Sequence, residues 1–104
     1  MLVSMLEILE KAKEGGYGVL APNVFNEDSV RVCIEAAVEL DSPLIIDVLP
    51  DNHKDIVSFG KLICSMANEV RIPIALNLDH GDSFEACVKA IYGGFTGVMV
   101  DRSA

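Results

Sequence analysis

The stretch Pro73-Ile74-Ala75-Leu76-Asn77-Leu78-Asp79-His80-Gly81 decides the fold of this chain, because an apolar run ends here in an acid, an imidazole and a glycine. A near-continuous apolar run is typical of a strand buried on both faces of a parallel sheet. Ligands of parallel α/β folds bind outside the carboxyl ends of the strands. Asp79 and His80 are therefore expected at the edge of the sheet where chemistry takes place.

Helices and strands alternate on both sides of this stretch. We expect an opening helix capped by Ser4 and running to Glu14, strands over 17–24, 44–49, 73–81 and 97–101, and helices over 27–40, over 56–70 and from the caps Asp82 and Ser83 to Gly93. An opening helix followed by βαβαβαβ predicts right-handed crossovers and a parallel sheet. Residues 1–104 are therefore expected to form a single α/β domain.

Three local features sharpen these expectations. Asn26 is a candidate N-cap for the second helix, and Pro22 is unusual inside a strand because it lacks a backbone donor. The last helix is expected to bury a stripe made of Phe84, Cys87, Val88 and Ile91. The strand over 97–101 has no covering helix after it, and such an exposed apolar edge favours pairing with another element or another chain.

Composition excludes several classes of partner. Sixteen acidic residues against eight basic ones give a formal charge of −8, which argues against nucleic acid and anionic membranes. No apolar run approaches the roughly 18 residues needed to span a bilayer, and charged residues soon after Met1 argue against a secretory leader. Three isolated cysteines, Cys33, Cys64 and Cys87, are expected to be buried free thiols. We expect a cytoplasmic protein.

Polar side chains end or nearly end all four expected strands: Asn23, Asp47, Asp79 and Asp101. In a parallel sheet these ends meet at one edge, which predicts a shared site. Neutral imidazole is the commonest metal ligand, so His80 is a candidate ligand beside a carboxylate that can act as acid or base. The alternative is that these Asn and Asp residues only form turns. His53 lies in a polar loop and is expected to be exposed, without a metal role.

Several motifs resemble one enzyme family. They are Leu2-Val3-Ser4-Met5, Glu14-Gly15-Gly16-Tyr17, Ala21-Pro22-Asn23-Val24, Ile34-Glu35-Ala36-Ala37, Asp41-Ser42-Pro43, Leu78-Asp79-His80-Gly81-Asp82-Ser83-Phe84-Glu85 and Val98-Met99-Val100-Asp101-Arg102-Ser103. The chain resembles, over essentially all its length, the class II zinc-dependent fructose-bisphosphate and tagatose-bisphosphate aldolases. The resemblance implies the first half of a TIM (β/α)8 barrel, which typically needs about 250 residues.

The resemblance also implies roles for four residues. Asp79 matches the catalytic acid/base, His80 a zinc ligand, Asp101 an acid near the metal that can serve a second metal position, and Asn23 an asparagine of the substrate pocket. The implied reaction is the lyase chemistry of this family, reversible aldol cleavage of fructose- or tagatose-1,6-bisphosphate to dihydroxyacetone phosphate and glyceraldehyde 3-phosphate. The choice between the two sugars stays open.

The chain departs from the family pattern at several positions. Pro22 stands where the family often has Phe, Asp47 and Leu49 stand where the fructose-specific branch commonly has Gln and Ser, and Arg102 replaces a small or apolar residue. The family's other zinc ligands, two histidines and a glutamate, have no counterpart here. Catalytic zinc normally takes three protein ligands, so we expect weak or no zinc binding by this chain alone.

Two hypotheses follow. In the first, the chain is the amino-terminal half of an aldolase that is inactive until a carboxy-terminal half supplies the missing ligands. In the second, it is a non-catalytic half-barrel that buries its open edges by self-association into a homo-oligomer.

Overall fold

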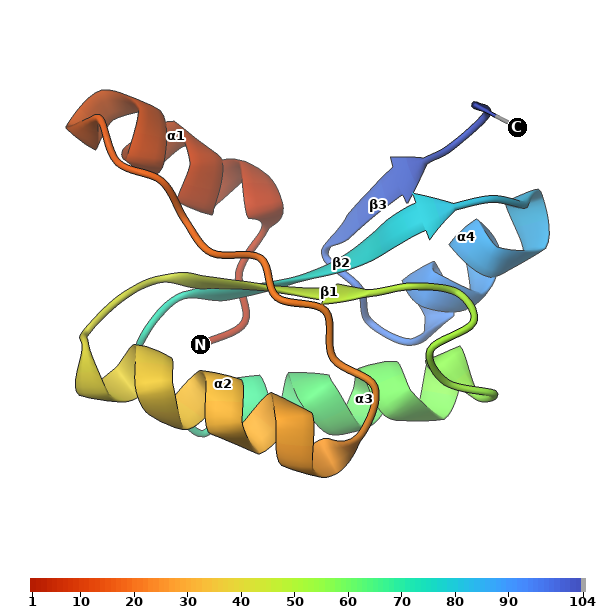
Figure 1. Ribbon diagram of the computed structural model, residues 1–104, viewed down its shortest axis with the longest axis horizontal. Helices are drawn as coiled ribbons and strands as arrows, with labels where there is room; N and C mark the ends of the chain where they lie inside the picture. The colour runs from red at the N-terminus through yellow and green to blue at the C-terminus, as the bar shows by residue number, and fades with distance from the viewer. Residues whose placement is uncertain (104) are drawn as a thin grey trace.

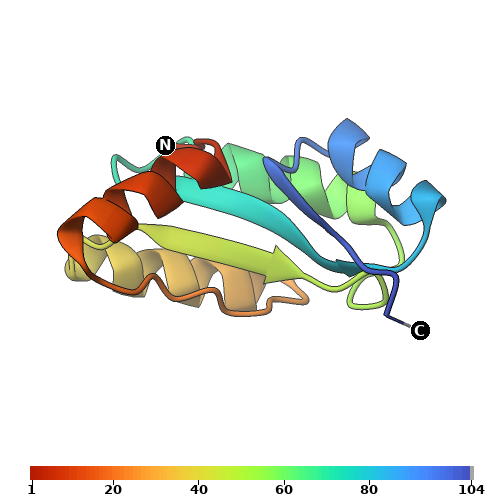
Figure 2. The same cartoon turned by 90° about the horizontal axis from the view of Figure 1, so that it is seen from above.

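A computed structural model describes residues 1–103 as a parallel α/β fold, as predicted. Its elements are α1 (Met5–Gly15), α2 (Glu27–Glu39), β1 (Leu44–Val48), α3 (Ile56–Ala67), β2 (Ile74–Gly81), α4 (Phe84–Tyr92) and β3 (Gly97–Val100). The strands form one sheet in the order β1-β2-β3. Figures 1 and 2 show α2, α3 and α4 on one face of this sheet and α1 on the other. No helix within residues 1–103 has the length and apolar character needed to cross a bilayer.

Side-chain caps fix where the helices begin. Ser4 Oγ accepts a hydrogen bond from the backbone N–H of Glu7 at 3.2 Å, and Asn26 Oδ1 accepts one from Ser29 at 2.8 Å. Ser83, rather than Asp82, caps α4. These bonds satisfy amide groups that have no partner inside the helix, which is why Ser and Asn predicted the starts well.

The expectation of a regular strand over residues 17–24 is wrong. This segment is extended and pairs with β1 through Ile45 N to Leu20 O, Asp47 N to Pro22 O and Val24 N to Asp47 O, at 2.9–3.1 Å. The next bond of such a ladder would run from residue 22 to Ile45 O, and Pro22 has no N–H to donate. Only the bridge between Asn23 and Asp47 remains. The segment still positions Asn23 beside the sheet.

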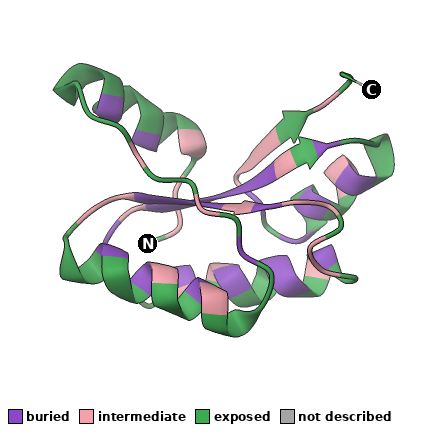
Figure 3. Ribbon diagram, viewed as in Figure 1, coloured by how far each residue is buried: buried purple, intermediate pink, exposed green. Residues whose placement is uncertain are grey.

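The two faces of the sheet bury different partners. Ile46, Ile74, Leu76 and Leu78 are fully buried under α2, α3 and α4. On the opposite face, Ile45 and Ala75 pack against Ile8 of α1 in a smaller cluster. Figure 3 shows the buried residues concentrated along β1 and β2. Beyond the smaller cluster, the α1 side of the sheet carries polar residues, and the predicted site lies there.

The predicted buried stripe of α4 is wrong. Phe84 is 85% exposed and Ile91 65% exposed, whereas Ala86 and Ala90 are buried against the sheet. Small side chains let this helix approach the sheet closely, so its larger apolar residues turn sideways. There they line a groove of about 560 Å³ beside the open edge of β3, together with Cys87, Val98 and Val100. The exposed apolar edge that the sequence predicts is therefore present, and the groove adds further apolar surface beside it.

The cysteines are free, as expected, but half-buried rather than buried. Burial raises the pKa of the Cys33 and Cys64 thiols above their usual value. Cys64 Sγ lies 3.4 Å from Gly94 O, against the turn that ends α4. Cys87 Sγ lies 4.0 Å from Gly81 O, next to His80, and none of the three thiols forms a hydrogen bond with Asp79, His80 or Asp101 in residues 1–103.

Candidate functional site

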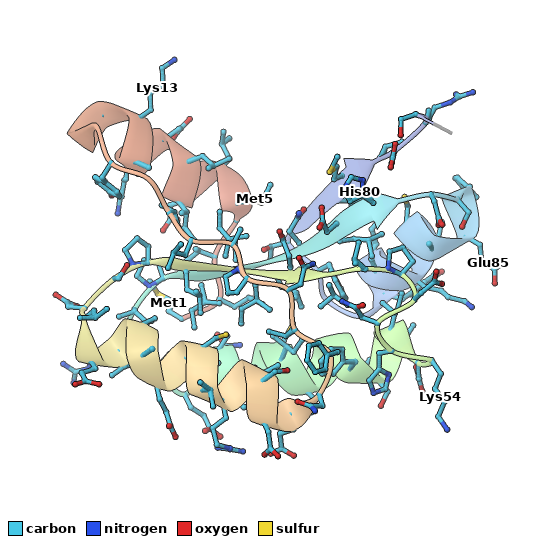
Figure 4. All side chains as sticks on the ribbon, in the orientation of Figure 1. Met1, Met5, Lys13, Lys54, His80 and Glu85 are labelled. Atoms are coloured by element: carbon cyan, nitrogen blue, oxygen red, sulfur yellow. The ribbon has the colours of Figure 1, made fainter. Side chains whose placement is uncertain are left out.

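The residues predicted from the ends of the strands come together at the carboxyl edge of the sheet. Asn23 Nδ2 donates to Asp79 Oδ2 at 3.3 Å, and His80 Nδ1 lies 2.8 Å from Asp101 Oδ2. His80 Nε2 lies 3.7 Å from Asp79 Oδ1. Figure 4 shows His80 at the end of β2 beside β3, far from the labelled Lys13 and Lys54. Four side chains from three separate segments therefore form one polar cluster.

An irregularity at the end of β2 presents His80. Its φ of +53° is uncommon for a residue other than glycine, and the pairing of β2 with β3 shifts register between Leu78 and Gly81. Pairing resumes where Asp101 N donates to Gly81 O at 2.9 Å. A Cβ on Gly81 would lie 2.9 Å from Met99 O, so the close approach requires glycine. The backbone thus holds His80 and Asp101 side by side.

His80 and Asp101 each favour the charged form of the other. Hydrogen bonds from Ser103 Oγ at 2.6 Å and Ser103 N at 2.9 Å, followed by that from His80, lower the pKa of Asp101 to about 2. The hydrogen bond to Asp101 and then the charge of Asp79 raise the pKa of His80 above its usual value. His80 remains 54% exposed, so an incoming ligand can reach its ring.

A second polar pair, which sequence reasoning missed in part, lies deeper on the same face. Asn77 Nδ2 donates to Asp47 Oδ1 at 3.0 Å. Burial raises the pKa of Asp47, partly offset by this bond and reinforced by the charge of Asp79. Asn77 is only 6% exposed, and its Oδ1 has no hydrogen-bond partner within residues 1–103. Such an unsatisfied atom costs about 1–3 kcal/mol. The sequence signal that could have identified Asn77 is its position two residues before Asp79, which places both side chains on the same face of the strand.

His53 does not join the site. Its ring stacks on Phe59 with centroids 4.6 Å apart, and its Nδ1 accepts a hydrogen bond from Asp55 N. The residue is half-buried, so the expectation of an exposed side chain is wrong. Its Nδ1 is used next to Asp55, the residue that caps α3, and the absence of a metal role stays a prediction.

Among the described residues, His80 is a candidate for one metal ligand, and the remaining ligands of a complete site are not found there. Within residues 1–103, no three His, Cys, Asp or Glu side chains are arranged to hold a metal ion. His80 fits a single ligand position, because Asp101 lies at Nδ1 and the neutral ring would offer its Nε2 lone pair, 3.7 Å from Asp79 Oδ1, to a metal ion. This carboxylate–histidine arrangement commonly orients a metal ligand.

Comparison with known structures places this geometry in a larger fold. The YdjI aldolase from Escherichia coli K12 superposes with a TM-score of 0.91 at 29% identity, covering 99% of this chain and 41% of that protein. The fructose-bisphosphate aldolase of Campylobacter jejuni superposes with a TM-score of 0.81 at 22% identity. The fold is therefore that of the amino-terminal half of a TIM barrel.

Sequence comparison gives the same result. The chain is 41% identical to fructose-bisphosphate aldolase of Thermus caldophilus, over 99% of this chain and 34% of that protein. It is 42% identical to the probable fructose-bisphosphate aldolase of Bacillus subtilis, over 98% of this chain and 38% of that protein. It therefore spans about a third of the length of these relatives. The family model described as fructose-bisphosphate aldolase class-II matches residues 3–104, and the chain belongs to this family.

Proposed function

We propose that this chain is the amino-terminal half of a class II ketose-bisphosphate aldolase, with fructose- or tagatose-1,6-bisphosphate as substrate. The observation that carries the proposal is the convergence of Asp79, His80, Asp101 and Asn23 at one edge of the sheet. The remaining part of the active site is supplied by polypeptide that residues 1–103 do not include.

Asp79 is the proposed acid/base. Its carboxylate accepts the proton of the substrate hydroxyl next to the bond that breaks, so that this carbon becomes an aldehyde. The electron pair of the broken bond stays with the ketone half, which is then protonated to dihydroxyacetone phosphate. In the reverse direction Asp79 returns the proton. The hydrogen bond from Asn23 keeps the Asp79 side chain in place, and the same amide is well placed to contact substrate.

His80 and Asp101 form the proposed metal-binding side of the site. His80 Nε2 supplies one zinc ligand, and Asp101 orients the ring through Nδ1 at 2.8 Å. The other ligands come from the rest of the barrel, since a catalytic zinc has three protein ligands. Zinc, when bound, supplies positive charge that stabilises the negative charge developing on the ketone half.

A chimera tests this proposal. Residues 1–104 are fused to the part of the Thermus caldophilus aldolase that the chain does not match, and cleavage is followed with and without zinc. We expect zinc-dependent cleavage that falls about 10²–10⁴-fold in Asp79→Asn, the range typical of a general acid/base. Asp51→Asn is the matched control, because Asp51 is an exposed loop carboxylate. A folded, zinc-loaded chimera without activity would refute the proposal.

A second candidate function is self-association into a non-catalytic half-barrel. Both sides of the sheet carry exposed apolar residues: Phe84, Ile91 and Val100 beside β3, and Leu20, Val32 and Leu40 around the segment that flanks β1. A second copy could place the segment 17–24, which flanks its β1, against the open edge of β3. The exposed apolar residues of both regions would then be buried. This arrangement needs no catalysis by Asp79.

Native mass spectrometry in zinc-containing buffer distinguishes the two candidates. A metal-free oligomer that unfolds on dilution favours self-association. A monomer whose secondary structure persists on dilution argues against it. An oligomer holding stoichiometric zinc, lost in His80→Ala, means that the metal site is rebuilt between copies.

A further inference from the structure

Asp47 lies on the same face of the sheet as Asp79, in the neighbouring strand. Its backbone pairs with Asn77 on one side and with Asn23 on the other, so it stands between two residues of the polar cluster. The residue is half-buried and therefore reachable from the site. Neither the proton transfer assigned to Asp79 nor the ligand role of His80 uses this carboxylate.

Asp47 leaves a carboxylate oxygen, a hydrogen-bond acceptor, on this wall. Asn77 Nδ2 donates to Asp47 Oδ1 at 3.0 Å, which is the orientation that an ionised carboxylate favours because it can only accept. The amide oxygen of Asn77 is left without a partner. The second oxygen of Asp47, Oδ2, accepts no hydrogen bond from residues 1–103. A ligand group that bonds to this oxygen of the ionised carboxylate must donate.

The charges around Asp47 also favour a ligand group that donates hydrogen bonds. Within the described part of the chain, no Lys or Arg forms an ion pair with Asp47, Asp79 or Asp101; the Arg and Lys pairs are Arg31–Glu27 and Lys89–Glu85, on helix surfaces. Leu49, two residues further along, is apolar and offers no donor. A phosphate is an acceptor with negative charge, so this wall repels it.

We propose that Asp47 is a specificity-determining residue that accepts a hydrogen bond from a substrate hydroxyl and excludes phosphate from this wall. The inference rests on the proposed function and adds a substrate orientation to it. Both phosphates of the sugar bisphosphate lie elsewhere in the barrel, and a hydroxyl-bearing carbon faces Asp47.

The test uses the chain alone, with glycerol and inorganic phosphate as probes in separate NMR titrations. The reporters are the side-chain amide signals of Asn23 and Asn77, on either side of Asp47. We expect glycerol, but not phosphate, to shift these signals in the wild type and in the control Asp51→Asn. In Asp47→Asn, phosphate should bind at least about tenfold more tightly. Asp47→Ser serves as a second variant if Asp47→Asn does not fold.

Two outcomes would overturn the inference: phosphate shifting the wild-type signals as strongly as glycerol does, or equal phosphate affinity in wild type and variant. If glycerol does not shift the wild-type amide signals, the proposed contact between Asp47 and a hydroxyl is overturned. None of these readouts needs zinc or turnover. An inactive chimera therefore refutes the proposed function and leaves the titration result valid. An active chimera, together with phosphate binding next to Asp47 in the wild type, refutes only the inference.

Discussion

The two faces of the sheet use alternate residues of the same strands, yet near the carboxyl ends one face is apolar and the other polar. Along β2, Ile74, Leu76 and Leu78 are fully buried beneath helices. At alternate positions, Asn77 and Asp79 face the other way and form hydrogen bonds with side chains from β1 and from the segment 17–24. A period of two residues thus separates packing from chemistry within one strand. Substitutions on the first face should change stability, and those on the second should change binding.

The largest expected effect is on the helix-covered face. Leu76→Ala removes a fully buried side chain and leaves a cavity between β2 and the helices, which should lower the free energy of unfolding by about 2–5 kcal/mol. Asp79→Ala, on the opposite face, should lower it by less than about 1 kcal/mol. Urea unfolding followed by circular dichroism measures both. Equal losses of unfolding free energy would mean that the two faces contribute equally to stability.

Adding a single methyl group should also be costly on the helix-covered face. A Cβ on Gly60 would lie 2.6 Å from Gly93 O and 2.8 Å from Phe95 Cε1, so Gly60→Ala forces α3 and the end of α4 apart. We expect a loss of about 1–3 kcal/mol in urea unfolding. Gly18→Ala is the control, because a Cβ there has no neighbour within 4 Å. If both variants unfold alike, the packing of α3 against α4 is looser than its geometry implies.

The helix-covered face was largely predictable from the sequence, because it depends on local patterns. The alternation of elements, the caps Ser4 and Asn26 and the apolar run of β2 all follow from periodicity and capping chemistry. The failures arose where one residue changed the outcome of a pattern. Pro22 removed a single donor and reduced a strand to one bridge, and the alanines of α4 replaced the larger stripe that includes Phe84.

The site was predictable only as a set of residues, since strand ends point to one edge but do not specify partners. Asn23, Asp79, His80 and Asp101 could be named, and their roles remain proposals. The bonds from Ser103 to Asp101 and from Asn77 to Asp47 could not be foreseen. Both depend on how a loop or a neighbouring strand lies in space, which a linear pattern does not encode.

A smaller effect is expected from Asn77→Ala, which removes the donor to Asp47 together with its own unsatisfied oxygen. These changes partly cancel, so we expect a loss of about 1 kcal/mol near neutral pH. The loss should shrink in acid. Burial already raises the pKa of Asp47, so its ionised form opposes folding, and without Asn77 that ionised form is still less favourable. Urea unfolding near pH 3 and pH 7 measures the difference, and an Asp47→Asn background should abolish it.

The smallest expected effect on stability comes from His80→Ala in metal-free buffer, and only its pH dependence is diagnostic. The raised pKa of His80 stabilises the fold below the usual value of 6.5, and this stability is lost as the pH rises through the folded pKa. The pKa of Asp101, lowered from 3.8 to about 2, stabilises the fold above 3.8 and is lost as the pH falls toward 2. The difference in melting temperature between wild type and His80→Ala should therefore be largest between these limits. His53→Ala is the matched control, since no acidic side chain pairs with His53 in residues 1–103. A flat difference for His80→Ala would mean that the exposed pair is screened by water, and that the Ser103 bonds alone hold Asp101 at the edge of the site.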